Sequence, residues 1–383
     1  MLSITIDLAR WIAALAVFLF HIKGHFTACC PNVAVLAKNV GFYGVAVFFV
    51  ISGYCITSSA DKASHHGAGQ LSFLKKRFFR IYPPFWAALI ITVLTPYLLE
   101  SISFLRTGHL AWPDRDWESY GVKDWLQIAS LARVFYGTEQ EDLHVLFRGV
   151  NPVYWTLAIE FQFYLVMFFS LLTKTYWKKT LAIVTFLGFV AMYFPSILPG
   201  ERSGFFNGLF LGYWPLFSIG IALYFLLKNG ISLTIFSKHI STLISVLIVF
   251  TLTTWVIHSA FENKIKADLM AGFGSDWFGF ALLSAMILWS LAPIEPYLRN
   301  GVESKCLVFS LPLKLGMFLG TISYSIYLLH ARMYQVVEKA VNYLHLTNSL
   351  YSVLAIIMGT ILISAIFYHF FEKPFIHYSK YRQ

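Results

Sequence analysis

Residues 42–59 read Phe-Tyr-Gly-Val-Ala-Val-Phe-Phe-Val-Ile-Ser-Gly-Tyr-Cys-Ile-Thr-Ser-Ser, a stretch without a charged side chain. A helix needs ~20 predominantly apolar residues to cross the hydrocarbon core of a bilayer, so this stretch predicts a membrane-spanning helix. Its small residues, among them Gly44 and Gly53, would let a neighbouring helix pack closely. Similar stretches recur along the chain, which predicts a bundle of such helices.

The composition of all 383 residues agrees with a chain embedded in a membrane. Hydrophobic residues make up 58% and charged residues only 13%, which is too apolar for a soluble domain of this length. We expect about ten spans, at 4–24, 42–59, 82–101, 153–172, 180–196, 207–227, 240–259, 272–292, 315–334 and 350–371. The predicted fold class is an all-α polytopic integral membrane protein. Asp7 and Arg10 lie inside the first span, so we expect it to be retained rather than cleaved as a signal peptide.

Lysine and arginine are unevenly distributed between the short loops. The loops after the second, fourth, sixth and eighth spans and the C-terminal tail carry most of them. Cytoplasmic loops carry such an excess, so we expect both the N- and C-termini in the cytoplasm. The formal net charge of +10 is explained by this orientation, and we expect no nucleic-acid partner.

One long segment, at about 102–152, is predicted to lie outside the membrane on the outer side. We otherwise expect residues 1–383 to form a single transmembrane domain without a fused soluble domain. The segment contains the aromatic residues Trp112, Trp117, Tyr120 and Trp125. These rings either contact a carbohydrate or anchor the chain at the membrane interface, and both interpretations stay open. The four cysteines show no spacing typical of a metal site or a disulfide framework.

Arg10 and His21 are ionisable residues within the first predicted span. Eleven positions separate them, which at ~100° per residue places both on one face of a helix, ~16 Å apart. Such a pair could bracket an elongated substrate. The simpler alternative is that Arg10 reaches the inner headgroups while His21 ends the helix. His25 follows His21 at i+4, but no third ligand is evident and we expect no metal.

Two further spans carry polar residues on one helix face. Glu160 and Tyr164 lie one turn apart in the fourth span, and a buried carboxylate there needs a partner, either a base such as Arg10 or a catalytic imidazole. In the ninth span Ser323, Tyr327 and His330 form a polar stripe. The spans therefore enclose ionisable groups that mark a functional site rather than a lipid-facing surface.

These segments together resemble the membrane-bound acyltransferase-3 family, in particular bacterial O-acetyltransferases that modify surface polysaccharides. The similarity runs in order through Arg10 and His21, Phe48–Tyr54, Arg77–Pro83, Trp155–Leu157 with Glu160, Phe163 and Tyr164, Phe217 and Gly220, Ile322–Leu328 with His330, and Glu372–Pro374. The resemblance implies about ten helices in a bacterial inner membrane. It also implies an acyl-coenzyme A donor on the cytoplasmic side and an acceptor at the outer face.

Acyl transfer to a hydroxyl needs a base, stabilisation of an oxyanion and a channel that positions both substrates. We expect His21 to be the base, because an imidazole exchanges protons near neutral pH. Arg10 and Glu160 complete the predicted catalytic set, with Glu160 orienting His21 or neutralising Arg10. A covalent acyl-histidine stays open as a variant.

The donor and acceptor sites are expected around the same helices. Arg77, Arg80 and Tyr82 are predicted to bind the coenzyme. Residues predicted to contact the substrates are Ser52, Tyr164, Tyr324 and His330. Acetyl-CoA is the expected donor, with no tightly bound cofactor, and the acceptor is expected to be a lipid-linked or polymeric carbohydrate such as O-antigen in lipopolysaccharide. Membrane lipids are the expected surroundings, and a homo-oligomer is left open.

Two other classes of function are compatible with a polytopic chain. One is a secondary transporter or export protein for a glycan or an acyl precursor, although such proteins often consist of two related halves, and no duplication is visible. The other is a non-catalytic module for assembly or lipid organisation. A purely structural module would not require Arg10 and His21 to share a helix face, so acyl transfer is the preferred hypothesis.

Overall fold

The computed structural model describes residues 2–65, 69–108, 115–132, 147, 149–194, 208–232, 238–262, 275–344 and 349–381. Within these ranges all regular secondary structure is helical, which confirms the predicted all-α class. The α-helices are α1 (Ile4–His21), α2 (Pro31–Val40), α3 (Gly44–His65), α4 (Gly69–Thr107), α5 (Val122–Ala129), α7 (Trp155–Leu172), α8 (Trp177–Tyr193), α10 (Trp214–Lys228), α11 (Lys238–Phe261), α12 (Ser275–Ser290), α13 (Glu295–Glu303), α14 (Leu307–Thr321), α15 (Ser323–Tyr343), α16 (Leu350–Phe367) and α17 (Lys373–Tyr381). Short 3₁₀ or π turns join several of them, including the π-helical turn Tyr368–Glu372 between α16 and α17.

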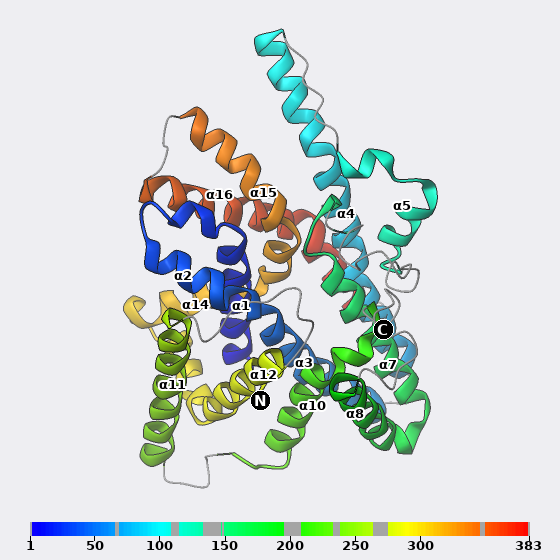
Figure 1. Ribbon diagram of the computed structural model, residues 1–383. Helices are drawn as coiled ribbons and strands as arrows, with labels where there is room; N and C mark the ends of the chain where they lie inside the picture. The colour runs from blue at the N-terminus through cyan, green and yellow to red at the C-terminus, as the bar shows by residue number, and fades with distance from the viewer. Residues whose placement is uncertain are drawn as a thin grey trace.

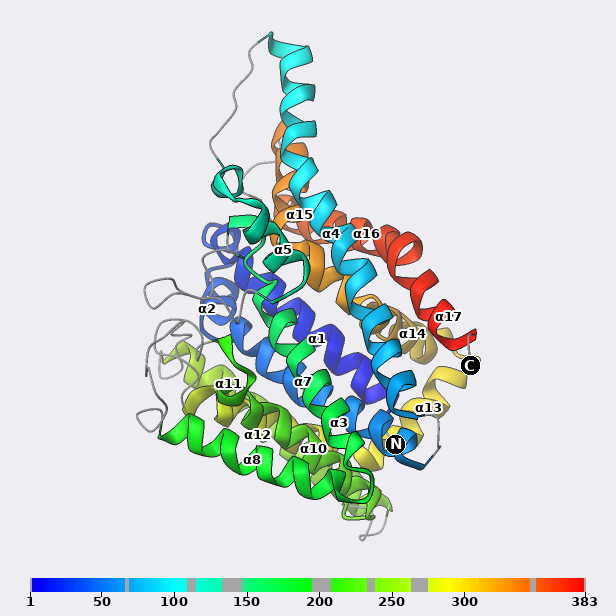
Figure 2. The ribbon, with the colours of Figure 1, turned by 90° about the vertical axis from the view of Figure 1, so that its right-hand side faces the viewer.

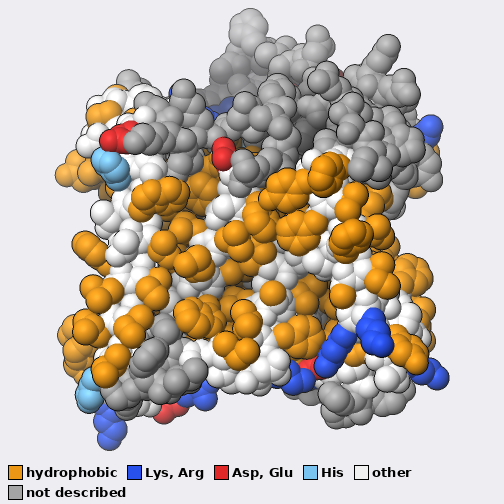
Figure 3. Space-filling model, turned by 60° about the horizontal axis from the view of Figure 1, so that its bottom comes forward, with side chains coloured by type: hydrophobic (Ala, Val, Ile, Leu, Met, Phe, Trp, Pro, Cys, Tyr) orange, Lys and Arg blue, Asp and Glu red, His pale blue; other side chains and the backbone are white. Residues whose placement is uncertain are grey.

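Seven helical segments of the described chain are long and apolar enough to cross a membrane, or eight if α14 and α15 form one bent span. The chain is therefore a multi-pass membrane protein. The predicted spans 180–196 and 207–227 correspond to α8 and α10, which have only 17 and 15 residues, fewer than the ~20 that a span requires. The count of ten and the cytoplasmic termini stay predictions. Apolar side chains cover much of the face in Figure 3, with Lys and Arg gathered near its lower edge.

The predicted ninth span, 315–334, is wrong as a single helix. The helix is interrupted at Ile322, and the axes of α14 and α15 meet at an angle of 69°. α14 packs directly on α1, because Gly320 has no side chain to collide with the backbone of Asp7. The bend then directs α15 across α4. As a result Ser323 and Tyr324 begin a helix inside the bundle instead of lying in the middle of a straight span.

The third predicted span also begins much earlier than residue 82. α4 is helical from Gly69 and runs through Pro83 and Pro84, although proline usually starts or kinks a helix. Arg77 and Arg80 therefore lie within a membrane helix rather than in a loop. At its other end α4 continues to Thr107, and Figures 1 and 2 show this end extending beyond the other helices.

The segment predicted to lie outside the membrane is only partly described. Trp112 falls outside the described residues. Trp117 is buried, and the guanidinium Cζ atoms of Arg115 and Arg332 lie 6.0 and 5.7 Å from its ring centre. Arg115 also pairs with Glu100 and Glu118. Trp117 therefore packs inside this cluster, and its ring face is not open for stacking on a sugar.

Two features fix the helices that carry the polar residues. α3 and α10 pack backbone to backbone, since a Cβ on Gly53 or Gly220 would collide with the carbonyl oxygen of Phe217 or Val50. The first turn of α1 is held by the buried carboxylate of Glu295. This carboxylate accepts hydrogen bonds from the backbone N–H groups of Ser3, Ile4 and Thr5 at 2.7, 2.8 and 3.0 Å, and from the hydroxyls of Ser3 and Thr5.

Candidate active site

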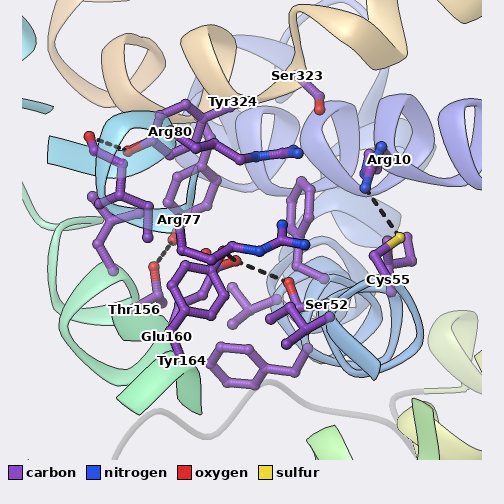
Figure 4. A pocket seen from close by; sticks show the side chains of 18 residues that line it. Arg10, Ser52, Cys55, Arg77, Arg80, Thr156, Glu160, Tyr164, Ser323 and Tyr324 are labelled. Carbon is purple, nitrogen blue, oxygen red and sulfur yellow. Dashed lines mark hydrogen bonds between the residues drawn. The ribbon is translucent and has the colours of Figure 1, made fainter. Parts of the chain in front are cut away.

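A polar cavity lies inside the bundle, between α1, α3, α4, α7 and the N-terminal part of α15 (Figure 4). Its open space is about 70 Å³, which holds a few water molecules or a slender chain. The polar side chains that line it are Arg10, Ser52, Cys55, Arg77, Arg80, Thr156, Glu160, Tyr164, Ser323, Tyr324 and Tyr327. Seven of the predicted site residues belong to this set: Arg10, Ser52, Arg77, Arg80, Glu160, Tyr164 and Tyr324.

Glu160 joins α7 to α3 at the centre of the cavity. Its Oε1 accepts hydrogen bonds from the Tyr164 hydroxyl at 2.6 Å and from the Ser52 hydroxyl at 3.0 Å. The guanidinium of Arg77 lies over the Tyr164 ring, 5.6 Å from its centre. The sequence predicted Arg10 or His21 as the partner of Glu160. Neither is among the described hydrogen-bond partners of Glu160. Its part in the reaction stays a prediction.

Arg10 is held from two sides. Its guanidinium pairs with Asp7 on the preceding turn of α1 at 3.1 Å and donates to the sulfur of Cys55 on α3 at 3.2 Å. The sequence signal for Asp7 was its i, i+3 spacing from Arg10. Cys55 could have been found by its i+3 spacing from Ser52 on α3. Asp7, rather than Glu160, is therefore the carboxylate that offsets the charge of Arg10.

The cavity is rich in arginine. Three guanidinium groups, those of Arg10, Arg77 and Arg80, line it together with the carboxylate of Glu160, and Asp7 pairs with Arg10. The Nε of Arg77 is buried and has no hydrogen-bond partner among the described residues. The N-terminus of α15, at Ser323, adds the positive end of a helix dipole. This combination is suited to a negatively charged group such as a phosphate.

Three tyrosines near the cavity have different roles. The hydroxyl of Tyr324 donates to the carbonyl oxygen of Ile81 at 3.0 Å and holds α15 against α4. The hydroxyl of Tyr327 lies 2.5 Å from that of Thr156. Tyr82 instead faces α5, where its hydroxyl donates to the carbonyl oxygen of Ser130 at 2.8 Å.

Tyr82 does not line this cavity, and its coenzyme-binding role stays a prediction. Arg80 and Tyr82 are two residues apart on α4, which places them ~200° apart around the helix axis. Arg80 faces the cavity, and Tyr82 is not among the residues that line it.

His21 and His330 lie outside the cavity, as a pair at the opposite end of α1 from Arg10. Their ring centres are 5.1 Å apart. His330 also contacts the ring of Tyr327, at 5.8 Å, and Tyr327 lines the cavity. The candidate site thus has two parts, an arginine-lined cavity and a histidine pair, with Tyr327 between them.

Together these features define an integral membrane protein whose ionisable groups are gathered inside the helix bundle, as in enzymes and transporters of the membrane. Residues 3–369 match the family model described as an acyltransferase domain. The chain therefore belongs to the acyltransferase-3 family, which confirms the resemblance seen in the sequence.

Relatives with assigned names agree with this membership. The chain is 25% identical over 393 residues to the peptidoglycan O-acetyltransferase OatA of Listeria monocytogenes serovar 1/2a, an alignment covering 98% of this chain and 57% of OatA. It is 27% identical over 241 residues to the acyltransferase MdmB of Streptomyces mycarofaciens, covering 58% of this chain and 57% of MdmB. The chain thus spans little more than half the length of OatA. No solved structure matches it.

Proposed function

We propose that this protein is an integral-membrane O-acetyltransferase. In this proposal it takes the acetyl group of acetyl-CoA from the cytoplasm and transfers it to a hydroxyl of a glycan at the outer face of a bacterial inner membrane. The observation that carries the proposal is the family match over residues 3–369, in a chain whose bundle encloses an arginine-lined cavity.

Arg77 and Arg80 are proposed to bind the phosphates of the donor. Guanidinium groups bind phosphates through charge-assisted, often bidentate hydrogen bonds, and the unpartnered Nε of Arg77 leaves a donor free for one. Ser52, Tyr164 and Tyr324 line the same cavity and would guide the pantetheine arm. Arg10 lies ~16 Å along α1 from His21, so it would contact this arm rather than the reacting carbonyl.

His21 is proposed as the general base. One ring nitrogen removes the proton of the acceptor hydroxyl while the hydroxyl oxygen attacks the thioester carbonyl. The tetrahedral intermediate then expels the coenzyme A sulfur, which receives that proton from His21. If His21 instead accepted the acyl group first, an acyl-histidine intermediate would form, and it should be trapped when the acceptor is withheld.

The acceptor is proposed to be a carbohydrate polymer or a lipid-linked glycan. The name of OatA makes peptidoglycan the first acceptor to examine. Surface polysaccharides, O-antigen among them, and periplasmic glucans are the others. Each offers secondary hydroxyls that the same chemistry would acylate.

Transport of a glycan or an acyl precursor is the second candidate. The break between α14 and α15 favours it, because broken helices form the binding sites of many transporters. In those folds the break usually occurs in both halves, and only this one bent pair occurs in the described part of the chain. A transporter would move its substrate without consuming acetyl-CoA.

Mass spectrometry of peptidoglycan and surface glycans tests the proposed function. Cells would express the wild type, His21→Ala, His25→Ala or no protein, with membrane insertion confirmed by immunoblot. His25 is the matched control, because it lies in the next turn and its ring pairs weakly with Glu338, at 3.7 Å. We expect an added acetyl mass with the wild type and His25→Ala only. The absence of any acyl mass on every glycan would contradict the proposal.

A further inference from the structure

His330 has a buried ring nitrogen that no described residue satisfies. The side chain is fully buried. Its Nδ1 lies 3.1 and 3.0 Å from the carbonyl oxygens of Ile326 and Tyr327. Carbonyl oxygens only accept hydrogen bonds, so Nδ1 carries the proton, and Nε2 of the neutral ring bears a lone pair. That Nε2 has no hydrogen-bond partner in the described structure, which is unusual for a buried polar atom.

Three rings surround His330, and one of them can supply the missing donor. Phe18 lies at 5.7 Å and has no polar group. The hydroxyl of Tyr327 is already engaged with Thr156 and the carbonyl oxygen of Val153. His21, at 5.1 Å and tilted by 59°, makes no hydrogen bond to any described residue. A small rotation of the two rings would bring a nitrogen of each to hydrogen-bond distance.

We propose that His330 is the positioning residue for His21, accepting a hydrogen bond on Nε2 from an N–H of the His21 ring. This inference rests on the proposed function, in which His21 is the base. The nitrogen that carries the proton in a histidine is decided by the hydrogen bond of its other nitrogen. With one His21 nitrogen held as a donor to His330, the other presents its lone pair to the acceptor hydroxyl.

The proton balance needs no other group. His21 gains the hydroxyl proton, is briefly an imidazolium held by the lone pair of His330, and returns the same proton to the departing sulfur. His330 keeps its Nδ1 proton throughout. It thus fills the place that a carboxylate occupies beside the base in a serine–histidine–aspartate triad, the role that the sequence had suggested for Glu160.

Two substitutions separate this role from a packing role. His330→Gln places its amide group near the position of Nε2 and can keep the acceptor toward His21. His330→Asn places its amide near Nδ1, so it can keep the bond to the backbone but loses the acceptor toward His21. A residue that served only to bond the backbone of α15 would favour asparagine over glutamine, whereas a positioning residue favours glutamine.

The measurement is transfer of labelled acetyl from acetyl-CoA to the glycan fraction of permeabilised membranes from expressing cells. We expect His330→Asn to lower kcat about 10- to 100-fold, the size of loss seen when metal-binding histidines lose the partner of their other nitrogen. The KM for acetyl-CoA should stay within about twofold because the cavity is intact. His330→Gln should recover a large part of this loss. In the His21→Ala background, His330→Asn should lower transfer no further, since groups acting as one unit are not additive.

Three results would overturn the inference: His330→Asn with wild-type kcat, His330→Asn more active than His330→Gln, or a further loss in the His21→Ala background. Failure of the proposed function gives a different pattern. There the wild type itself transfers no acetyl, or His21→Ala is as active as the wild type, and the role of His330 falls with it.

Discussion

At the scale of single residues, the cavity depends on how a few charges are paired. Asp7 pairs with Arg10, and Glu160 accepts hydrogen bonds from Ser52 and Tyr164. Arg77 rests on the Tyr164 ring with its Nε unsatisfied. A buried N–H without a hydrogen-bond partner is costly to maintain, so Arg77 is the residue from which the strongest contact with an anionic donor is expected.

Arg77→Ala should therefore weaken donor binding. Loss of a hydrogen bond to a charged group costs about 1.5–3 kcal/mol, which corresponds to a rise in KM for acetyl-CoA of about 10- to 100-fold. Steady-state kinetics with varied acetyl-CoA measure this. Lys75→Ala is the control, because Lys75 lies on the exposed face of the same helix. An unchanged KM in Arg77→Ala would remove Arg77 from the donor site.

At the scale of helices, α1 carries both parts of the candidate site, with Arg10 in its N-terminal half and His21 at its C-terminal end. Its first turn is capped by Glu295 on α13, which lies about 290 positions away in the sequence. The Glu295 carboxylate accepts hydrogen bonds from N–H groups that a helix N-terminus leaves unpaired. A carboxylate there is also favoured by the helix dipole. This contact sets where α1 begins, and hence where its two functional residues lie.

Glu295→Ala should destabilise the fold. Removal of a helix cap costs about 0.5–2 kcal/mol, and the additional hydroxyl contacts of Ser3 and Thr5 place this site at the upper end, about 2 kcal/mol. Thermal unfolding of the purified protein in detergent tests this. Glu303→Ala serves as the control, since Glu303 is exposed at the end of the same helix. Equal melting temperatures for the two variants would contradict the capping role.

At the scale of the whole molecule, orientation decides which compartment supplies each substrate. Asp61 and Lys228 pair at the ends of α3 and α10, so two positions assigned to the cytoplasm from their sequence lie together. Helix α5 is expected on the outer side, and its end packs against the middle of α4, where Trp86 donates a hydrogen bond to the carbonyl oxygen of Ala129. The proposed reaction requires this orientation, with acetyl-CoA and the acceptor arriving from opposite faces.

Labelling with a membrane-impermeant thiol reagent tests the orientation. In a protein whose four cysteines are replaced by serine, Lys123→Cys on α5 should react in intact spheroplasts. Lys305→Cys, predicted to be cytoplasmic, should react only after the membrane is opened. Both side chains are exposed in the structure, so the protein itself does not shield either position from the reagent. A difference in labelling then reports the side of the membrane on which each position lies. The reverse labelling pattern would invert the predicted topology.

The sequence by itself determined the helical, membrane-spanning class of this chain and its family. Seven of the ten site residues predicted from it line the cavity. These follow from local rules, because hydropathy and the 3.6-residue period decide which segments span and which residues share a face. The same rule, applied to Arg80 and Tyr82, would have placed these two side chains on different faces of α4.

Only the tertiary structure decided how those residues are paired. Glu160 meets Ser52 across 108 positions of sequence, Glu295 caps α1 across 291, and His330 lies beside His21. Partners so far apart in sequence depend on how helices pack and where they bend, as α14 and α15 do at Ile322. Local periodicity carries no information about such contacts, since many packings of the same helices satisfy it.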